Sequence, residues 1–246
     1  MSLASKPVRS PGLIEGVVLK LFTRSAKITA VEALTDSFRL ITLGGEALQG
    51  VPWIPGQKVQ MQFGSWVQRT YTPISWDAHS GSTQLLAYLH GDSPGANWAR
   101  SVELGDSCTL FGPRDSLNLN ALERPALLFG DETSFGLAHA LRFTPGKARG
   151  VELVLEVASQ DAARTVLERV GVANAHLVTR TAGDAHLQEV EEKVAAILGK
   201  EPLEQCVLSG KSTSIQRLNR TLRQRGLSSR QIKTRAYWAP GKKGLD

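Results

Sequence analysis

The stretch Gln68–Ser75, which reads QRTYTPIS, places a cation, a phenol ring and a hydroxyl along one short extended segment. Side chains alternate between the two faces of a strand, so Arg69 and Tyr71 are predicted to point one way and Thr72 the other. A guanidinium can grip a phosphate through its planar fork of donors, and a tyrosine ring can lie flat against an aromatic group. The segment is therefore either one wall of a cradle for a phosphate-bearing aromatic cofactor or a plain strand with an exposed arginine.

A second stretch, His90–Trp98, follows along the chain and is typical of a tight turn that enters a short helix. Ser93 is a candidate N-cap, and Pro94 suits the first helical position. Residues Gly95–Asn97 would then present unpaired backbone N–H groups at the positive end of the helix dipole, an arrangement that binds phosphate. The alternative is an ordinary capped helix whose donors face water.

Composition limits the class of protein. The 246 residues suffice for one large domain or two small ones, and hydrophobic and charged fractions of 41% and 21% are those of a globular protein. The net charge of +6 favours anionic partners.

The two cysteines, Cys108 and Cys206, lack CxxC spacing, which fits a reducing compartment. The histidines lack the spacing of metal ligands, so we expect no metal site. No signal peptide or membrane span is visible, so we expect a cytoplasmic protein with no membrane insertion.

Short strand-like segments dominate the first half of the chain after a polar arm of about sixteen residues. Residues 27–34, 38–43 and 57–63 alternate apolar and polar side chains with a period of about two, and glycine- or proline-containing turns separate the segments. Close spacing of strands with little helix predicts a small antiparallel barrel. The candidate strands are residues 27–34, 38–43, 57–63, 69–75, 83–89 and 107–111.

The pattern changes after Pro125 to strands that alternate with helices. Residues 126–129 form a continuous apolar run, as expected of a strand that is buried on both faces. Such alternation predicts a parallel, doubly wound sheet. We therefore expect a β-barrel domain over residues 1–120 and an α/β domain over residues 121–246. The later candidate strands are residues 151–157, 177–179, 206–208 and 232–238.

The segment Gly130–Thr133, Gly-Asp-Glu-Thr, lies where the first buried strand ends and a helix begins. Open α/β sheets bind ligands outside the carboxyl ends of their strands, so this segment is a candidate nucleotide contact. The dinucleotide fingerprint GxGxxG is absent. The alternative is that the two acidic residues simply complement the dipole of the helix.

Three other patterns are rejected. Gly91–Gly95 spells the GxSxG of a hydrolase elbow, but Pro94 follows the serine and has no N–H to serve as an oxyanion donor. Gly210–Thr213 is similar to the end of a P-loop, but Gln205 occupies the position of the motif's first glycine. The arginine-rich last helix carries no aromatic stacking platform, so we expect no nucleic-acid partner.

Together these features resemble the siderophore-interacting proteins of the ferredoxin–NADP reductase superfamily. The resemblance rests on the order of barrel and α/β domain, on Arg-x-Tyr-Thr at 69–72, and on the stretches 90–98 and 130–133. It also rests on the ending Tyr-Trp-Ala-Pro-Gly-Lys at 237–242, and it covers nearly the whole chain. It implies an FAD-dependent reductase of ferric siderophores, which are anionic chelates, with NAD(P)H or reduced ferredoxin as electron donor.

The resemblance also implies roles for individual residues. Arg69 would bind a cofactor phosphate, Tyr71 would pack on the isoalloxazine, and Thr72 would hydrogen-bond near its reactive nitrogen, so Tyr71 and Thr72 are the candidate catalytic residues. The other cofactor-binding candidates are His90, Gly95, Ala96, Asn97 and Trp98 beside the flavin, Gly130, Asp131 and Thr133 on the nicotinamide side, and Trp238. The candidates for holding the anionic chelate are Lys58, Lys242 and Lys243.

Three departures from the family pattern bear on the choice of electron donor and on the siderophore contacts more than on flavin binding. Pro73–Ser75 replaces a frequent second arginine, Lys211 replaces a frequent glutamate after glycine, and Ala239 replaces a basic residue. Two alternatives follow. One is an NAD(P)H-dependent flavin or ferredoxin reductase with another acceptor, and the other is a non-catalytic chelate-binding protein.

Overall fold

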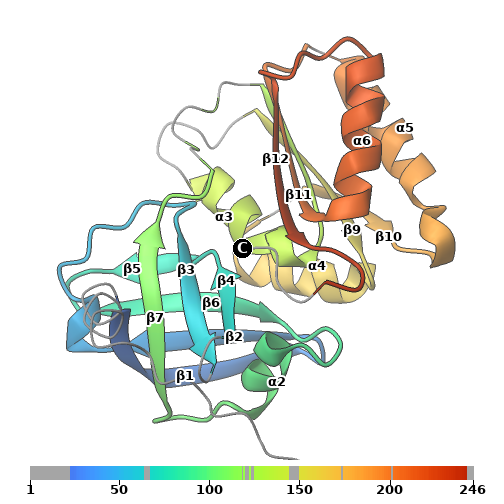
Figure 1. Ribbon diagram of the computed structural model, residues 1–246. Coiled ribbons are helices and arrows are strands. Elements are labelled where there is room, and N and C mark those ends of the chain that lie inside the picture. The colour runs from blue at the N-terminus through green and yellow to red at the C-terminus, as the bar shows by residue number, and fades with distance from the viewer. Residues whose placement is uncertain are drawn as a thin grey trace, which may run out of the picture.

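The structure is a computed structural model, and it describes residues 23–63, 67–117, 119, 122, 125–143, 150–172, 174–200 and 202–242 (Figure 1). An antiparallel seven-stranded sheet is followed along the chain by a parallel five-stranded sheet with helices on its faces. The predicted fold class, an antiparallel flavin-type barrel followed by an α/β domain, is confirmed.

The first sheet has the strand order β4-β3-β7-β1-β2-β6-β5. In the described part of the chain no ladder of hydrogen bonds joins its edge strands β4 and β5, but the sheet curls so that β4 and β6 approach each other (Figure 1). Alternate side chains of these strands, such as Ile41, Met61 and Leu85, fill the interior. Its strands are β1 Thr23–Thr35, β2 Phe38–Gly44, β3 Lys58–Phe63, β4 Val67–Tyr71, β5 Ser75–Asp77, β6 Ser82–Tyr88 and β7 Ser107–Arg114.

The predicted strand over residues 69–75 is wrong in its extent. β4 ends at Tyr71, and the separate strand β5 begins at Ser75 on the opposite edge of the sheet. Pro73 lacks the N–H that a ladder needs, so it favours a break between the two strands. This break lets Thr72 leave the sheet and face the second half of the molecule.

The second sheet has the order β10-β9-β8-β11-β12, and all of its pairs are parallel. All five residues of β8 are buried, which confirms the strand predicted from the apolar run. The strands are β8 Ala126–Gly130, β9 Val151–Val157, β10 Ala175–Thr179, β11 Gln205–Lys211 and β12 Ile232–Trp238. The helices are α3 Phe135–Phe143, α4 Gln160–Arg169, α5 Leu187–Leu198 and α6 Ser212–Gln224, with the short turns η2 Glu132–Ser134 and η3 Ala182–Asp184.

Helices cover both faces of this sheet (Figure 1). Leu128 of β8 packs in one cluster with α3 and α4, whereas its neighbours Leu127 and Phe129 pack in another with α5 and α6. This follows from the alternation of side chains along a strand. Burial on both faces explains why β8, in the middle of the sheet, is a continuous apolar run.

Helix α3 joins the two halves. Phe38 of β2 stacks on Phe135 of α3, with ring centroids 5.4 Å apart and an interplanar angle of 5°. Leu40 and Ile74 of the first half belong to the same buried cluster as α3 and α4. This continuous apolar contact sets the two sheets against each other and forms the seam at which the candidate site lies. No helix in the described part of the chain is long and apolar enough to cross a membrane.

Candidate functional site

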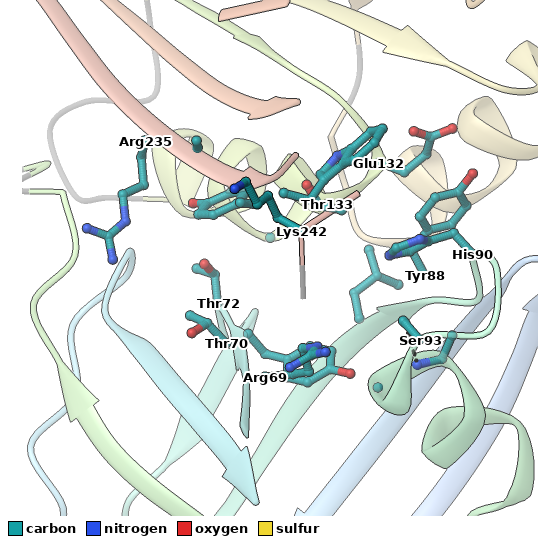
Figure 2. A pocket seen from close by; sticks show the side chains of 18 residues that line it. Arg69, Thr70, Thr72, Tyr88, His90, Ser93, Glu132, Thr133, Arg235 and Lys242 are labelled. Atoms are coloured by element: carbon teal, nitrogen blue, oxygen red, sulfur yellow. Dashed lines mark hydrogen bonds between the residues drawn. The ribbon is translucent and has the colours of Figure 1, made fainter. Parts of the chain in front are cut away.

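A cleft opens at the seam between the two sheets (Figure 2). Arg69, Thr70 and Thr72 lie on the wall that the antiparallel sheet contributes, and Glu132 and Thr133 lie on the opposite wall. Figure 2 shows Tyr88 and His90 at one end of the cleft and Arg235 at the other. The sequence-predicted residues that line it are Arg69, Tyr71, Thr72, His90, Gly95, Ala96, Thr133, Trp238 and Lys242.

The floor of the cleft forms where β4 meets the start of the helix α2, Pro94–Ser101. A Cβ atom at Gly95 would lie 3.0 Å from Tyr71 Oη and 3.1 Å from Arg69 Cγ. Arg69 and Tyr71 therefore project from the same face of β4, as predicted, and the backbone of α2 approaches both of them. Glycine is the residue that permits this approach without displacing either side chain.

The predicted trio of free backbone donors at α2 is wrong. Ser93 caps the helix as expected, because its Oγ accepts a hydrogen bond of 3.3 Å from the N–H of Ala96. The N–H of Asn97 donates to the carbonyl of Ser93 at 2.9 Å. Among the described residues, Gly95 is then the member of the trio whose N–H has no partner. Asn97 is exposed and its amide oxygen accepts from Arg100, so it lies outside the cleft lining.

Tyr71 is held by other aromatic side chains. Its ring centroid lies 6.2 Å from that of Trp98, which in turn lies 5.1 Å from Phe63. Burial raises the pKa of the Tyr71 phenol, so it is neutral at physiological pH. Trp98 thus supports the floor from below rather than lining the cleft.

Thr72 faces the other half of the molecule. A Cβ atom at Gly136, in the first turn of α3, would lie 2.6 Å from the carbonyl oxygen of Thr72 and 3.1 Å from its Cβ. The Thr72 side chain lies beside the hydroxyl of Tyr237 of β12, and burial raises the pKa of Tyr237 to about 12. The predicted divergence of Thr72 from Arg69 and Tyr71 is thereby confirmed.

The opposite wall is organised by Asp131, which is 1% exposed. Its carboxylate accepts hydrogen bonds from the N–H and the hydroxyl of Thr133, and from Nε1 of Trp238 at 2.7 Å. Burial raises the pKa of Asp131 to about 6. Asp131 therefore lies behind the wall and positions Thr133 and Trp238, which do line the cleft. Gly130 is buried as well and does not belong to the lining.

Aromatic side chains connect this wall with the end of the cleft. His90 stacks on Tyr88 with centroids 5.2 Å apart, and it lies 6.4 Å from the ring of Trp238. Burial is the main cause that lowers the pKa of His90, so this imidazole is neutral at pH 7. The three rings give this end of the cleft flat, uncharged surfaces.

An ion pair behind these rings was not predicted. Nη1 and Nη2 of Arg180 donate to the carboxylate of Glu132, at 2.6 and 2.7 Å, and the N–H of Ala158 donates to the same carboxylate at 2.6 Å. The interpretation of Glu132 as a helix-dipole residue therefore missed its main partner. Nothing local in the sequence marks Arg180, because the pair joins positions 48 residues apart.

The three cations Arg69, Arg235 and Lys242 line the cleft, whereas its acidic residue Glu132 is neutralised by Arg180. Arg235 was also missed, although it lies two residues before Tyr237 in β12 and by period-two alternation shares a face of the strand with it. The cleft therefore suits an anionic ligand.

Lys58 lies on β3 opposite Arg114 of β7 and outside the cleft lining, and Lys243 lies outside the described residues. Cys108 and Cys206 are free thiols. Among the described residues no cluster of histidine, cysteine or acidic side chains could hold a metal ion.

Two family models match most of the sequence. A model of the siderophore-interacting protein matches residues 124–241, and a model of the siderophore-interacting FAD-binding domain matches residues 62–117. The chain belongs to the siderophore-interacting protein family. This membership supports a flavoprotein that binds FAD. No curated relative matches the sequence at a significant level.

Solved structures share the fold of this siderophore-interacting protein. A siderophore utilization protein from T. fusca has a TM-score of 0.70 at 20% identity, with 91% of this chain and 95% of that chain covered. The siderophore-interacting protein SipS from Aeromonas hydrophila has a TM-score of 0.70 at 19% identity, covering 90% and 93%. A ferredoxin NADP+ reductase from Neisseria gonorrhoeae, solved with FAD and NADP, has a TM-score of 0.68 at 13% identity, covering 88% and 99%.

The residues of the cleft fit a flavin. The Tyr71 ring offers a flat, uncharged surface, and beside it Arg69 carries a guanidinium, a group that can bind a phosphate. A side chain at position 95 would fill the space between the helix backbone and these two residues. Because Gly95 has no side chain, the space in front of its backbone N–H stays open for a phosphate. Tyr88, His90 and Trp238 add aromatic surface on the far side.

Proposed function

We propose that this siderophore-interacting protein is an FAD-dependent reductase of ferric siderophores that releases ferrous iron. The observation that supports this proposal is the cationic cleft in which the Arg69–Thr72 segment meets the start of α2 and the Asp131-centred wall. Residues 1–120 would act as the FAD-binding unit and residues 121–246 as the nicotinamide-nucleotide unit. The cytoplasm, where free cysteines stay reduced, suits this reaction.

The bound flavin would supply the redox chemistry, because it accepts two electrons as a hydride and passes them on singly. The protein would orient and shield it. Arg69 and the N–H of Gly95 would hold the phosphates beside Ala96, and the neutral Tyr71 ring would pack on the isoalloxazine without placing a charge against it. The Thr72 hydroxyl, directed by Tyr237, would hydrogen-bond near the reactive nitrogen. His90, Trp98 and Trp238 would support the flavin. Asn97 lies outside the cleft lining, so it would contribute only as part of the helix α2.

The electron donor and the ferric chelate that accepts the electrons would share the part of the cleft that the flavin leaves open. Thr133, held by Asp131 at the end of β8 beside Gly130, would contact NAD(P)H, and reduced ferredoxin is the alternative donor. Arg235 and Lys242, together with Lys243, would hold the anionic ferric chelate. Lys58 is kept as a more distant candidate, because it lies outside the cleft lining.

The experiment that tests this function is anaerobic turnover of the FAD-loaded protein with a panel of anionic, neutral and cationic ferric chelates. Ferrous iron is trapped with a chromogenic chelator, so that each acceptor yields its own kcat and KM. We expect the anionic chelates to have the highest kcat/KM. Arg235→Ala and Lys242→Ala should each raise the KM for these chelates by about three- to fivefold at low salt, and the effect should shrink at high salt.

Two controls sharpen the result. Tyr71→Ala should weaken FAD binding by about tenfold, the typical order for one lost aromatic stack. Arg220→Ala removes an exposed arginine of α6 outside the cleft lining and should leave both FAD affinity and KM unchanged. A protein that binds no flavin contradicts the proposal. Flavin-loaded protein that reduces no ferric chelate leaves the two alternatives, a reductase with another acceptor or a non-catalytic chelate-binding protein.

A further inference from the structure

Thr72 lies in a gap between two strands of the antiparallel sheet. It follows the last residue of β4 and precedes Pro73, which has no N–H to donate to a ladder. The sheet holds the residues on either side, since Tyr71 belongs to β4 and the N–H of Ile74 donates to the carbonyl of Gln84 at 3.0 Å. The position of Thr72 itself therefore depends on what packs against it.

The first turn of α3, in the parallel half, packs directly against Thr72. A Cβ atom at Gly136 would lie 2.6 Å from the carbonyl oxygen of Thr72, 3.1 Å from its Cβ and 3.5 Å from its carbonyl carbon. The two shorter distances are below the roughly 3.5–4.0 Å at which non-bonded heavy atoms make their best contact. Gly136 is buried, and glycine is the residue type that lets the helix backbone approach Thr72 this closely.

The helix is the less yielding side of this contact. Phe135, the residue before Gly136, is fully buried and stacks on Phe38 of β2. A packed interior resists displacement. Thr72 is half-buried and borders the open cleft, so a side chain at position 136 would push Thr72 toward the cleft rather than move α3.

A second element of the parallel half lies beside the same side chain. Tyr237, near the end of β12, has its hydroxyl beside the Thr72 side chain, and both residues line the cleft. Figure 2 shows Thr72 on the wall of the antiparallel half, with Thr133 and Lys242 of the other half across from it. The direction of the Thr72 hydroxyl therefore depends on Gly136 behind it and on Tyr237 beside it.

We propose that Gly136 and Tyr237 are positioning residues that fix the Thr72 hydroxyl against the bound flavin and thereby tune the reduction potential of the flavin. Hydrogen bonds to the ring nitrogens of a flavin tune its electronics. Such groups act only when they are held within about 0.5 Å of their productive position. The inference rests on the proposed function, because it needs a flavin at Thr72.

The test is an anaerobic measurement of the midpoint potential of the bound FAD, made against a redox dye. The absorbance spectrum of the oxidised, FAD-loaded protein is a second readout, and neither readout requires turnover. Thr72→Val removes the hydroxyl and keeps the branched shape of the side chain, so it defines the size and the direction of the shift. We expect about a tenfold change in the equilibrium between oxidised and reduced flavin, which is about 30 mV for a two-electron couple.

Gly136→Ala and Tyr237→Phe should each shift the potential in the same direction as Thr72→Val. The first displaces the hydroxyl, and the second removes its neighbour without adding volume, so Tyr237→Phe still decides if Gly136→Ala does not fold. In the Thr72→Val background neither change should shift the potential further, because no hydroxyl is left to position. Shifts that add in the double variants contradict the inference, and so does a Thr72→Val potential equal to that of wild type.

Gly199→Ala is the matched control. Gly199 directly follows α5 with φ −75°, and a Cβ atom there would make only ordinary contacts, of 3.5 and 3.7 Å, with the carbonyl oxygens of Ala195 and Ala196. The change replaces a glycine without a collision, so the flavin potential should equal that of wild type. A shift as large as that of Gly136→Ala would trace the effect to glycine replacement in general and overturn the inference.

Failure of the inference is distinguishable from failure of the proposed function. FAD-loaded protein whose potential is unchanged in both Gly136→Ala and Tyr237→Phe overturns the inference alone, because reduction of ferric chelates is measured separately. Protein that binds no flavin overturns both.

Discussion

Replacing Gly210 by alanine tests how the wall of the cleft is built. Gly210 lies in β11 with φ +97°, and a Cβ atom there would lie 2.5 Å from the carboxyl carbon of Asp131. That carboxyl group cannot move aside freely, because Thr133 and Trp238 both bind it. The alanine methyl group therefore meets a strained backbone and a collision at the same time.

Two costs add in Gly210→Ala. An alanine with positive φ costs about 1–2 kcal/mol, and forcing a methyl group into a packed interior costs about 1–3 kcal/mol more. The free energy of unfolding should therefore fall by roughly 2–5 kcal/mol, and Tm by at least about 4 °C for a chain of this size. Because Asp131 holds Trp238 at the cleft, we also expect weaker binding of FAD.

Gly226→Ala is the matched control. Gly226 has φ +93°, and a Cβ atom there would have no neighbour within 4 Å. Gly226→Ala carries the same cost of a positive φ without the collision. Calorimetric unfolding of the two variants therefore separates the backbone cost from the cost of the collision. We expect Gly210→Ala to be less stable than Gly226→Ala by about 1–3 kcal/mol. Equal stabilities would refute the reasoning, because the Asp131 carboxyl would then be free to yield.

Three further predictions concern the same region. Burial raises the pKa of Asp131 from 3.8 to about 6, so its neutral form favours folding fully below about pH 4, and this contribution is lost as the pH rises through 6. Asp131→Asn should therefore gain stability relative to wild type across this window, by at most about 3 kcal/mol, and a difference independent of pH would contradict the assignment. Gly95→Val should weaken FAD binding by about tenfold or more, because its side chain would press on Tyr71 Oη, as fluorescence titration can show. His186→Ala should destabilise the fold by about 3–5 kcal/mol in urea unfolding, since Glu156 loses a buried partner, and an unchanged midpoint would argue against that bond.

Much of the fold could be predicted because its signals are local. The apolar run of β8, the period-two recurrence of apolar residues in β3 and the Ser93 cap of α2 are properties of neighbouring residues, and the structure has both strands and the cap. The extent of β4 was less readable. An extended chain continues through Thr72, and only the pairing of β5 with β6 shows that Ser75 belongs to the other edge of the sheet.

The sequence by itself determined the two-sheet architecture and the residue types of the cradle at Arg69–Thr72 and Ser93–Ala96. Periodicity, capping and the backbone freedom of glycine act within a few residues, so they can be read from the chain. Only the tertiary structure decided that Asp131 binds Trp238, 107 positions away, and that Glu132 binds Arg180. Such partners depend on strand order and on the burial that makes an unpaired charge costly, and neither is written in any one stretch of sequence.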